Sequence, residues 1–284
     1  MAMRVLFTGA SSALGSRVLQ QMLESESYSE IWCVHHRTEL AVADERVRVI
    51  DLDLTSDFDL KDIPTPIDLV IHFAARTHAP DPEEYFRVNH QGTVRLAQAA
   101  HARGCRRFVY ISTRCATANA GAYGQSKLAA EEELKTFAWQ SLLIIRASEV
   151  YGAGGSEGID SLISLARRWH ITPMLFGSSG IEFAPLHIDD FVAIVAGAIA
   201  SQKEGPIIME LCGPEDLSGP SLAWALAKRF RALPVPVWWP LLALCLRAGR
   251  QVGLNLTAPD QTERLICAKT SSARGADAIG DIRF

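Results

Sequence analysis

Residues 4–15 have the sequence Arg-Val-Leu-Phe-Thr-Gly-Ala-Ser-Ser-Ala-Leu-Gly, and this stretch decides the fold. Its first part, Arg4–Thr8, is largely apolar and typical of a strand. After it, the apolar residues of 13–25 follow helical spacing. A glycine at such a turn lets the backbone turn tightly and approach a pyrophosphate, whose charge meets the helix N-terminus. The stretch therefore predicts a dinucleotide-binding loop made of Gly9, Ser11, Ser12, Ala13, Leu14 and Gly15.

The alternation of strand and helix patterns continues through the first half of the chain. Short apolar runs predict strands over 31–34, 47–54, 69–73, 107–111 and 142–146, and helical spacing predicts helices over 82–103 and 123–138. Buried strands that alternate with helices indicate a parallel sheet covered on both faces. We therefore predict an α/β fold with a doubly wound parallel sheet.

The composition changes after Gly152, which indicates a second lobe. Residues 152–158 are glycine-rich and predict a linker, whereas 188–200 and 207–211 return to the pattern of the main sheet. We expect the nucleotide-binding domain to consist of 1–152 and about 188–212, and a smaller C-terminal substrate lobe of about 153–187 and 213–284. Parallel sheets bind ligands beyond the carboxyl ends of their strands, so the cleft between the lobes is the expected site.

The overall composition is that of a globular protein and excludes several classes. Of 284 residues 48% are hydrophobic and 21% charged, and the formal net charge is −4, which gives no support to nucleic-acid binding. The eight histidines show no metal-ligand spacing. Six cysteines form no C-x-x-C pair, and the chain opens directly into a strand-like run without a secretory signal. These features predict a cytoplasmic protein with a small-molecule substrate and no bound metal.

Residues 233–246 are the most apolar stretch and include Trp238 and Trp239. The stretch is too short to span a bilayer as a helix. We expect a buried or pocket-lining helix here, with contact to a membrane surface as the alternative.

Tyr123 and Lys127 are the first candidates for chemistry. On a helix, positions four apart lie on one face, so the phenol and the ammonium project together. A nearby ammonium favours the phenolate, which lets tyrosine exchange a proton near neutral pH. The predicted strand before them leads into Ser112 and Thr113, whose hydroxyls lie at a strand's carboxyl end, where ligands bind.

In combination these motifs resemble the extended short-chain dehydrogenases/reductases, which include the nucleotide-sugar epimerases and dehydratases. The resemblance runs along nearly the whole chain, through residues 8–15, 53–55, 72–75, 88–93, 111–113, 123–127, 146–152 and 186–190. It implies a Rossmann sheet, an NAD(P) cofactor, and hydride transfer between the nicotinamide and a CH–OH/C=O carbon.

The resemblance also implies roles for individual residues. Tyr123 would be the general acid/base, Lys127 would lower its pKa and hold the nicotinamide ribose, and Thr113 would hydrogen-bond the reacting oxygen. Asn89 would support the surrounding hydrogen-bond network. The implied cofactor contacts are Asp53 and Leu54 at the adenine, Phe73, Ala74 and Ala75 along the channel, and Ile111, Lys127, Ala147 and Ser148.

The end of the second predicted strand bears on the choice of cofactor. NAD-selective sites place a carboxylate there to hold the ribose 2′-hydroxyl. Residues 33–37 are Cys-Val-His-His-Arg, with no carboxylate, and Arg37 could pair with a 2′-phosphate, assisted by His36. The sequence therefore favours NADP(H) over NAD(H).

Three positions depart from the family pattern. Ser12 replaces the middle glycine of the loop and could donate to a phosphate oxygen. Glu149 stands where many relatives carry a substrate-contacting Asn, and a carboxylate there would disfavour a diphosphate. Phe183 occupies the place of an Arg found in sugar-nucleotide enzymes, so Arg250 or Arg264 would have to meet a diphosphate, although both are expected at the surface.

Our leading interpretation is an NADP(H)-preferring epimerase or oxidoreductase with a sugar-nucleotide-like substrate. One alternative is an NADPH-dependent reductase of small carbonyl compounds, which the apolar 233–246 stretch and Phe183 would suit. Another is a cofactor-binding regulator without turnover, against which Thr113, Tyr123 and Lys127 argue. Helices 82–103 and 123–138 carry alanine-rich faces that would suit a homodimer or packing on their own sheet.

Overall fold

The structure is a computed structural model that describes residues 2–36, 38–154, 158–178, 181–201, 203–251, 261–267 and 269. The chain divides into two compact units, which are treated separately. The first consists of Met1–Thr113, Ser126–Arg146 and Val192–Met209, and the second of Arg114–Gln125, Ala147–Phe191 and Glu210–Phe284.

A seven-stranded sheet in the order β11-β6-β5-β4-β1-β2-β3 forms the centre of the first unit. Its strands are β1 (Met3–Thr8), β2 (Tyr28–His35), β3 (Val47–Asp51), β4 (Leu69–His72), β5 (Arg107–Thr113), β6 (Ser141–Ala147) and β11 (Gly205–Leu211). Strand β1 pairs in parallel with both β2 and β4, so the order reverses beside it. The predicted doubly wound parallel α/β sheet is confirmed, and β11 joins it as expected.

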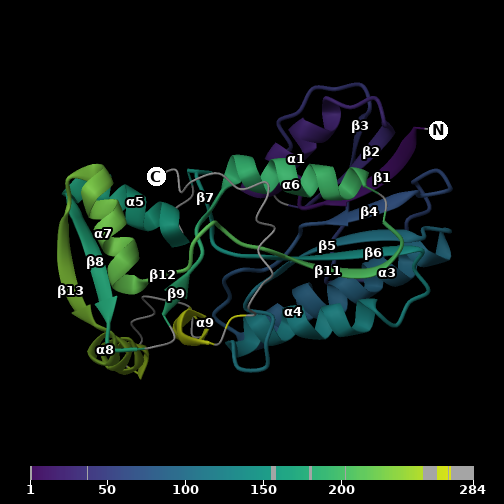
Figure 1. The fold of residues 1–284 in the computed structure, drawn as a ribbon. Coiled ribbons are helices and arrows are strands. Elements are labelled where there is room, and N and C mark those ends of the chain that lie inside the picture. The colour runs from purple at the N-terminus through teal and green to yellow at the C-terminus, as the bar shows by residue number, and fades with distance from the viewer. Residues whose placement is uncertain are drawn as a thin grey trace. The chain divides into compact units, whose positions relative to one another are not determined.

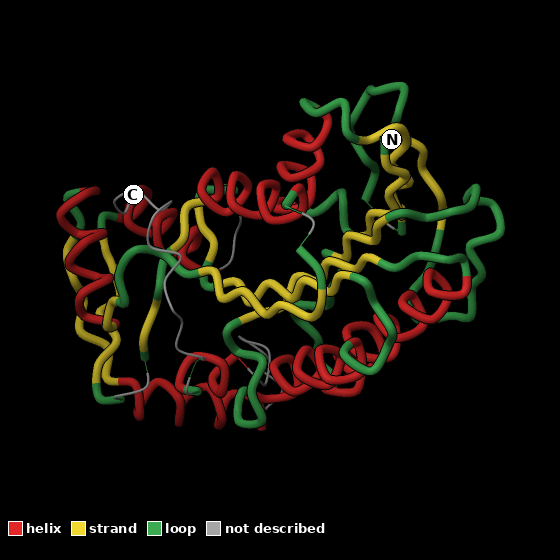
Figure 2. Tube along the Cα trace, turned by 45° about the vertical axis from the view of Figure 1, so that its right-hand side comes forward, coloured by secondary structure: helices red, strands yellow, loops and turns green. Residues whose placement is uncertain are grey.

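Helices cover both faces of this sheet. Figure 1 shows α1 (Ala13–Leu23) and α6 (Ile188–Ala200) over one face, and α3 (Thr93–Ala102) and α4 (Gly121–Leu134) over the other. The strands lie between these two helical layers in the turned view as well (Figure 2). Strand β1 is buried at Val5, Leu6 and Phe7, as a strand covered on both faces must be.

The predicted helix 82–103 contains one irregularity. It begins with α2 (Pro82–Tyr85), continues as the π-helix η1 (Phe86–Gly92) and ends as α3. A π-helical turn changes the direction of the side chains that it carries and is frequent at functional sites. Here it carries Asn89, whose side chain is fully buried.

The second unit is built from small elements around its own core. Its helices are α5 (Gly158–Trp169), α7 (Gly219–Phe230), α8 (Trp239–Gln251) and α9 (Gln261–Ile266). Its strands form three pairs, β7 (Val150–Tyr151) with β10 (Leu186–His187), β9 (Glu182–Phe183) with β12 (Leu217–Ser218), and β8 (Ile171–Phe176) with β13 (Leu233–Trp238). The core includes Tyr151, Ile159, Phe183, Leu226 and Trp239.

The expectation of a buried helix over 233–246 is wrong. The first part of the stretch is β13, because Pro234 and Pro236 lack the N–H that a helix interior needs. Only the second part is helical, and Leu233 and Leu244 are 66% and 63% exposed. In the part of the chain that the structure describes, no helix is long and apolar enough to cross a membrane.

Candidate cofactor site and active site

The loop between β1 and α1 can be built only with glycine at two positions. Gly9 has φ +74°, and a Cβ there would lie 2.5 Å from the backbone nitrogen of Ala74. A Cβ on Gly15 would lie 2.2 Å from the Gly9 carbonyl oxygen. Both obstacles are backbone atoms and cannot rotate away. The loop therefore packs backbone against backbone, as the close approach of a pyrophosphate requires.

Ser12 has a structural role in this loop. Its Oγ accepts a hydrogen bond from the Gly15 N–H at 3.0 Å and donates to the Gly9 carbonyl at 2.8 Å. The serine is thus the N-cap of α1, and Ala13, Leu14 and Gly15 form the first turn. The Ser12 hydroxyl donates its hydrogen to the Gly9 carbonyl in this structure, whereas the sequence suggests donation to a phosphate oxygen.

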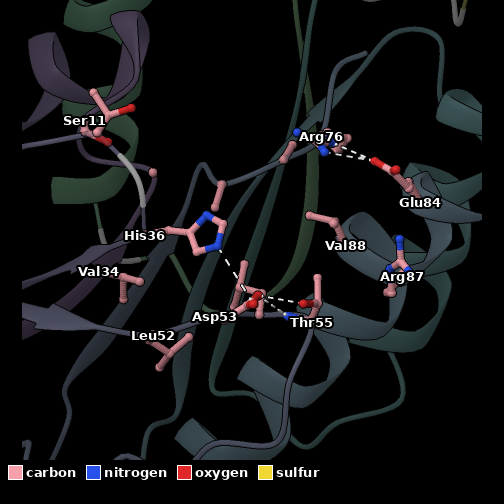
Figure 3. Close-up of a pocket in the computed structure, with 15 residues that line it drawn as sticks. Ser11, Val34, His36, Leu52, Asp53, Thr55, Arg76, Glu84, Arg87 and Val88 are labelled. Carbon is pink, nitrogen blue, oxygen red and sulfur yellow. Dashed lines mark hydrogen bonds and ion pairs between the residues drawn. The ribbon is translucent and has the colours of Figure 1, made fainter. Parts of the chain in front are cut away.

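A cavity of about 680 Å³ opens beside the loop (Figure 3). This volume is in the range of small-molecule and cofactor sites. Of the predicted cofactor residues, the structure places Gly9, Ser11, His36, Asp53, Leu54, Ala74 and Ala75 in its wall. Arg37 lies outside the described residues. Thr55 and Val88, from two of the motifs quoted above, also line the wall. Its other residues, which no motif indicated, are Val34, Thr38, Leu52, Arg76, Glu84 and Arg87.

The polar groups of the cavity hold one another in position. Asp53 accepts hydrogen bonds from the backbone N–H and the hydroxyl of Thr55, both at 2.8 Å. His36 Nε2 lies 3.8 Å from the Asp53 carboxylate, and Arg76 pairs with Glu84 at 2.9 Å (Figure 3). The position of Arg76, directly after the Phe-Ala-Ala run, is the sequence signal that could have identified it.

Two predicted residues beside the cavity are fixed by packing. Phe73 contacts Phe7, with ring centroids 5.4 Å apart. His72 is fully buried, with Nδ1 bonded to the Thr8 hydroxyl and Nε2 to that of Thr93 at 2.8 Å. Burial, aided by the charge of Lys127, lowers the pKa of His72 to about 3, so its ring is neutral. Both ring nitrogens are bonded within the core, so this histidine is structural.

Lys127 is almost completely buried under β5. Its Nζ donates to the carbonyl of Ile111 at 2.6 Å and lies 4.1 Å from the centre of the Tyr110 ring. Burial lowers the pKa of Lys127 to about 7, although the negative charge of Glu131 opposes this shift. The ammonium can therefore lose its proton near neutral pH while it remains hydrogen-bonded to the strand.

Asn89 connects α4 to the end of β4. Its amide group donates to the Ser126 hydroxyl at 3.2 Å and to the Arg76 carbonyl at 3.0 Å, and its oxygen accepts from the Arg76 N–H at 2.7 Å. Asn89 thus holds Arg76 in the cavity wall. Through Ser126 it also holds the residue of α4 that directly precedes Lys127.

Thr113 is the last residue of β5, and Tyr123 lies in the first turn of α4, four residues before Lys127. In the second unit the Arg264 guanidinium of α9 stacks over the Tyr123 ring at 4.4 Å from its centre. Arg264 is half-buried, so the expectation of a surface residue is wrong. The side chain of Arg250 lies outside what the structure describes.

Glu149 forms an ion pair that sequence reasoning missed. Lys269 Nζ lies 2.8 Å from its Oε1, and the Ala184 N–H donates to its Oε2 at 2.9 Å. Burial raises the pKa of Glu149, but the charge and hydrogen bond of Lys269 together keep it below its ordinary value. Lys269 also lies 5.1 Å from the centre of the Phe183 ring. The Glu149 charge is therefore matched, and its expected repulsion of a diphosphate is weakened.

Ala147 and Ser148 belong to the second unit. The Ala147 carbonyl accepts from the Arg114 N–H at 3.0 Å, and the Ser148 hydroxyl donates to the Ala184 carbonyl at 2.6 Å. Both groups are thus engaged by the protein itself. Among the described residues no three His, Cys, Asp or Glu side chains are grouped to hold a metal ion.

Comparison with known proteins identifies the family to which the chain belongs. Residues 5–212 match the model of the NAD dependent epimerase/dehydratase family. The chain is 29% identical over 266 residues to a UDP-glucose 4-epimerase of Vibrio cholerae, a match that covers 82% of this chain and 79% of that protein. It is 28% identical over 189 residues to a ceramide reductase of Caulobacter vibrioides, covering 66% and 58%.

A solved structure of similar fold is the UDP-glucuronic acid 4-epimerase of Bacillus cereus in complex with NAD. Its TM-score is 0.69 at 22% identity, and the match covers 83% of this chain and 85% of that one. The loop, the sheet order and the family match agree. The chain therefore belongs to the NAD dependent epimerase/dehydratase family, within the extended short-chain dehydrogenases/reductases, and is an NAD(P)-dependent enzyme of the oxidoreductase type.

Proposed function

We propose that this protein is an epimerase or reductase that acts on a CH–OH/C=O carbon of a sugar-nucleotide-like substrate. The observation that carries the proposal is α4, which places Tyr123 one turn before Lys127, with the Lys127 ammonium bonded to the strand that ends at Thr113. The family match and the Vibrio relative, a UDP-glucose 4-epimerase, support this substrate class.

The cavity and its loop fit a dinucleotide. Gly9 and Ser11 line the cavity just before the N-terminus of α1, where a pyrophosphate would bind, and the cavity has the volume of a cofactor site. Gly9, Ser11, Asp53, Leu54, Ala74 and Ala75 would hold the cofactor there. When bound, NAD(P) supplies the hydride acceptor or donor of the reaction.

Tyr123 is proposed to move the proton. The phenol would release its proton to the substrate oxygen in reduction and take it back in oxidation, while the Thr113 hydroxyl hydrogen-bonds the same oxygen. The cation of Arg264 over the Tyr123 ring favours the phenolate, because a nearby positive charge stabilises the ionised form. Lys127 would add to this effect in its protonated state.

Arg264 is also the proposed partner of a substrate diphosphate. It supplies a cation close to the candidate acid/base, whereas the family position at Phe183 is apolar. The ion pair of Glu149 with Lys269 supports this assignment, because it removes an unmatched carboxylate from the second unit.

NADP(H) is the proposed preferred cofactor. Strand β2 ends at His35 and is followed by His36, so no carboxylate directly follows the strand. Arg37→Ala is expected to weaken NADPH binding by about 1–3 kcal/mol, as for the loss of a charge-assisted contact, and to leave NADH binding unchanged. Fluorescence titration with both cofactors measures the difference. An equal loss for both would exclude a contact with the 2′-phosphate.

The test of the substrate class is a calorimetric titration of the NADP-saturated protein with UDP, dTDP and GDP. We expect one of them to bind at micromolar strength, and Arg264→Met to weaken that binding while cofactor affinity stays unchanged. Failure of all three to bind would contradict the sugar-nucleotide assignment.

A carbonyl reductase is the second candidate. It is favoured by the apolar Phe183, which lies where sugar-nucleotide enzymes carry an arginine, and by the Caulobacter relative, a ceramide reductase. Oxidation of NADPH by a panel of aldehydes and ketones, without binding of any nucleoside diphosphate, would favour this function.

A further inference from the structure

The second unit carries an unusual concentration of exposed apolar and basic side chains. Residues 161–181 and 217–259 contain seven Lys and Arg but no Asp or Glu, in a chain whose formal net charge is −4. Large exposed apolar side chains gather in the same segments, among them Trp169, which is 63% exposed. Exposed apolar groups bordered by like charges mark a surface that binds a partner.

The outer face of the β8–β13 pair forms the apolar part. Leu233 pairs with Ile171, and side chains alternate along strands, so Ile171, Leu233 and Val235 share one face. The opposite face carries Thr172, whose buried hydroxyl donates to the Ala223 carbonyl of α7. At the start of the strand pair Ile171 and Leu233 therefore lie on the side opposite the Thr172 hydroxyl, and these two side chains and that of Val235 are exposed.

The edge of β13 that faces away from β8 lacks two of the N–H groups with which another strand would pair. The Leu233 N–H donates to the His170 carbonyl, so the odd-numbered N–H groups point toward β8. Residues 234 and 236 are directed to the other edge, and both are prolines without an N–H. A partner must therefore contact this surface through its side chains, because the backbone offers no ladder for strand addition.

Cations border the apolar face where its strands begin. Arg167 and Arg168 end α5, and Lys228 and Arg229 lie in the last turn of α7 with Arg231 just beyond it. All five side chains are exposed. Arg168 lies 5.6 Å from the centre of the Trp169 ring. A second copy of this face would bring like charges together, whereas an anionic partner would neutralise them.

The end of β13 and the start of α8 carry further exposed apolar side chains. Trp238 ends β13, and Leu241 and Leu244 lie three residues apart on α8, so they face the same side of this helix. All three are more than half exposed. Tryptophan and leucine are among the apolar side chains that interfacial segments place in the headgroup region of a bilayer.

We propose that this surface, defined by Trp169, Ile171, Leu233, Val235, Leu241 and Leu244 with its basic border, binds the protein peripherally to membranes that contain anionic phospholipids. The apolar side chains would enter the headgroup region, while the arginines and Lys228 would contact the lipid phosphates. Aliphatic groups of this number do not suit a nucleic acid, whose contacts are polar and stacking.

The test is co-sedimentation of the full-length protein with vesicles of phosphatidylcholine, with and without 30% phosphatidylglycerol (about a third of the lipid being enough to attract basic residues). We expect binding only to the anionic vesicles, and weaker binding at high salt. Arg168→Glu with Lys228→Glu should reduce the partition coefficient by at least about tenfold, because each cation contributes near the surface. Trp169→Ser with Leu233→Ser should reduce it by a similar factor.

Matched variants in the first unit control for net charge and apolar content. Lys61→Glu with Lys135→Glu changes the charge equally, and Val49→Ser with Ile208→Ser removes exposed apolar groups there. Neither should alter partitioning. Equal losses in these controls, or no binding to anionic vesicles, would overturn the proposal. Binding of a single-stranded oligonucleotide in place of vesicles would also overturn the proposal. The same holds for a dimer, detected by light scattering, that Leu233→Ser dissociates into monomers.

Discussion

In the first unit the candidate cofactor site is fixed by backbone contacts, whereas in the second the surroundings of Tyr123 are fixed by side chains. Gly9 and Gly15 admit no other residue, because backbone atoms occupy the space of a side chain. In the second unit, by contrast, Arg264 and Lys269 come from the far end of the sequence, and Arg264 contacts the Tyr123 ring while Lys269 forms an ion pair with Glu149. Cofactor binding in the first unit should therefore tolerate little change, while the side chains near Tyr123 can change with the substrate.

The difference suggests how one family scaffold serves many substrates. A seven-stranded sheet with covered faces holds the cofactor loop rigidly, since β1, which leads into the loop, is paired with a strand on each side. In the described part of the second unit the strands form two-stranded pairs around a separate core. Four predictions test this contrast, beginning with the largest effect.

Tyr123→Phe should separate chemistry in the second unit from binding in the first. We expect turnover to fall by about 10²–10⁴-fold, the usual contribution of a general acid/base, because the variant keeps the ring but loses the proton. NADPH affinity should stay unchanged. Steady-state kinetics on the substrate found by the titration, with fluorescence titration of the cofactor, measures both. Full turnover in this variant would remove Tyr123 from its assigned role.

Gly15→Ala should show how strictly the backbone sets the first unit. The new methyl group would lie 2.2 Å from the Gly9 carbonyl oxygen, so the loop must move. We expect a loss of about 3 kcal/mol or more in the free energy of unfolding, measured by urea denaturation, and loss of NADPH binding.

Gly197→Ala is the matched control, because nothing lies within 4 Å of a Cβ at that helical position. This variant should be stabilised by about 0.5–1 kcal/mol, since alanine is the better helix former. Similar results for the two variants would contradict a steric requirement at Gly15.

The pH dependence of stability should reveal the buried ammonium of Lys127. Its pKa is about 7 in the folded, cofactor-free protein, against about 10.4 in the unfolded chain. Between these values the unfolded chain binds one more proton, so the free energy of unfolding rises with pH by about 1.4 kcal/mol per pH unit. Below pH 7 both states are protonated and this slope disappears.

The slope is obtained from urea denaturation between pH 6 and pH 9, as the pH dependence of the difference in the free energy of unfolding between wild type and Lys127→Met. Lys135→Met changes an exposed lysine one residue after the end of α4. Its difference from wild type in the free energy of unfolding should not depend on pH in this range. A flat difference for Lys127→Met as well would show that the lysine keeps an ordinary pKa in the folded protein.

Lys269→Met should have the smallest of these effects and should be confined to the second unit. Removal of the ammonium leaves the Glu149 carboxylate without its ionic partner, which should cost about 1–2 kcal/mol, because the carboxylate keeps its hydrogen bond from the Ala184 N–H. A second change, Glu149→Gln, should restore most of the loss, because the amide carries no charge to neutralise. Thermal melting of both variants measures this, and no rescue would mean that Lys269 acts through its contacts with the Glu182 carbonyl and the Phe183 ring.

Much of the first unit could be predicted from local sequence. The strands β1, β4 and β5 were expected from apolar runs, and α1 from helical spacing after Gly9. The π-helix at Asn89 was not expected, because a π-helix has no distinct hydrophobic period over seven residues. The cavity wall at Arg76 and Glu84 was also not predicted, since an ion pair between a loop and a short helix leaves no periodic signal.

The stretch 233–246 shows where local reasoning failed. Its hydrophobicity suggested burial, but Pro234 and Pro236 direct the first part into a strand, and pairing with β8 leaves Leu233 exposed. Hydrophobicity measures the gain from burial and does not supply the partner that would cover the side chain.

The sequence by itself determined the α/β sheet, the glycine loop of the cofactor site and the spacing of Tyr123 and Lys127, because these features depend on backbone sterics and on periodicities of a few residues. Only the tertiary structure decided that Lys127 loses charge by burial, that Arg264 stacks on Tyr123 and that Lys269 neutralises Glu149. Desolvation and ion pairing depend on which side chains meet across the chain, and residues 120 or more positions apart, such as Glu149 and Lys269, carry no local pattern that predicts their contact.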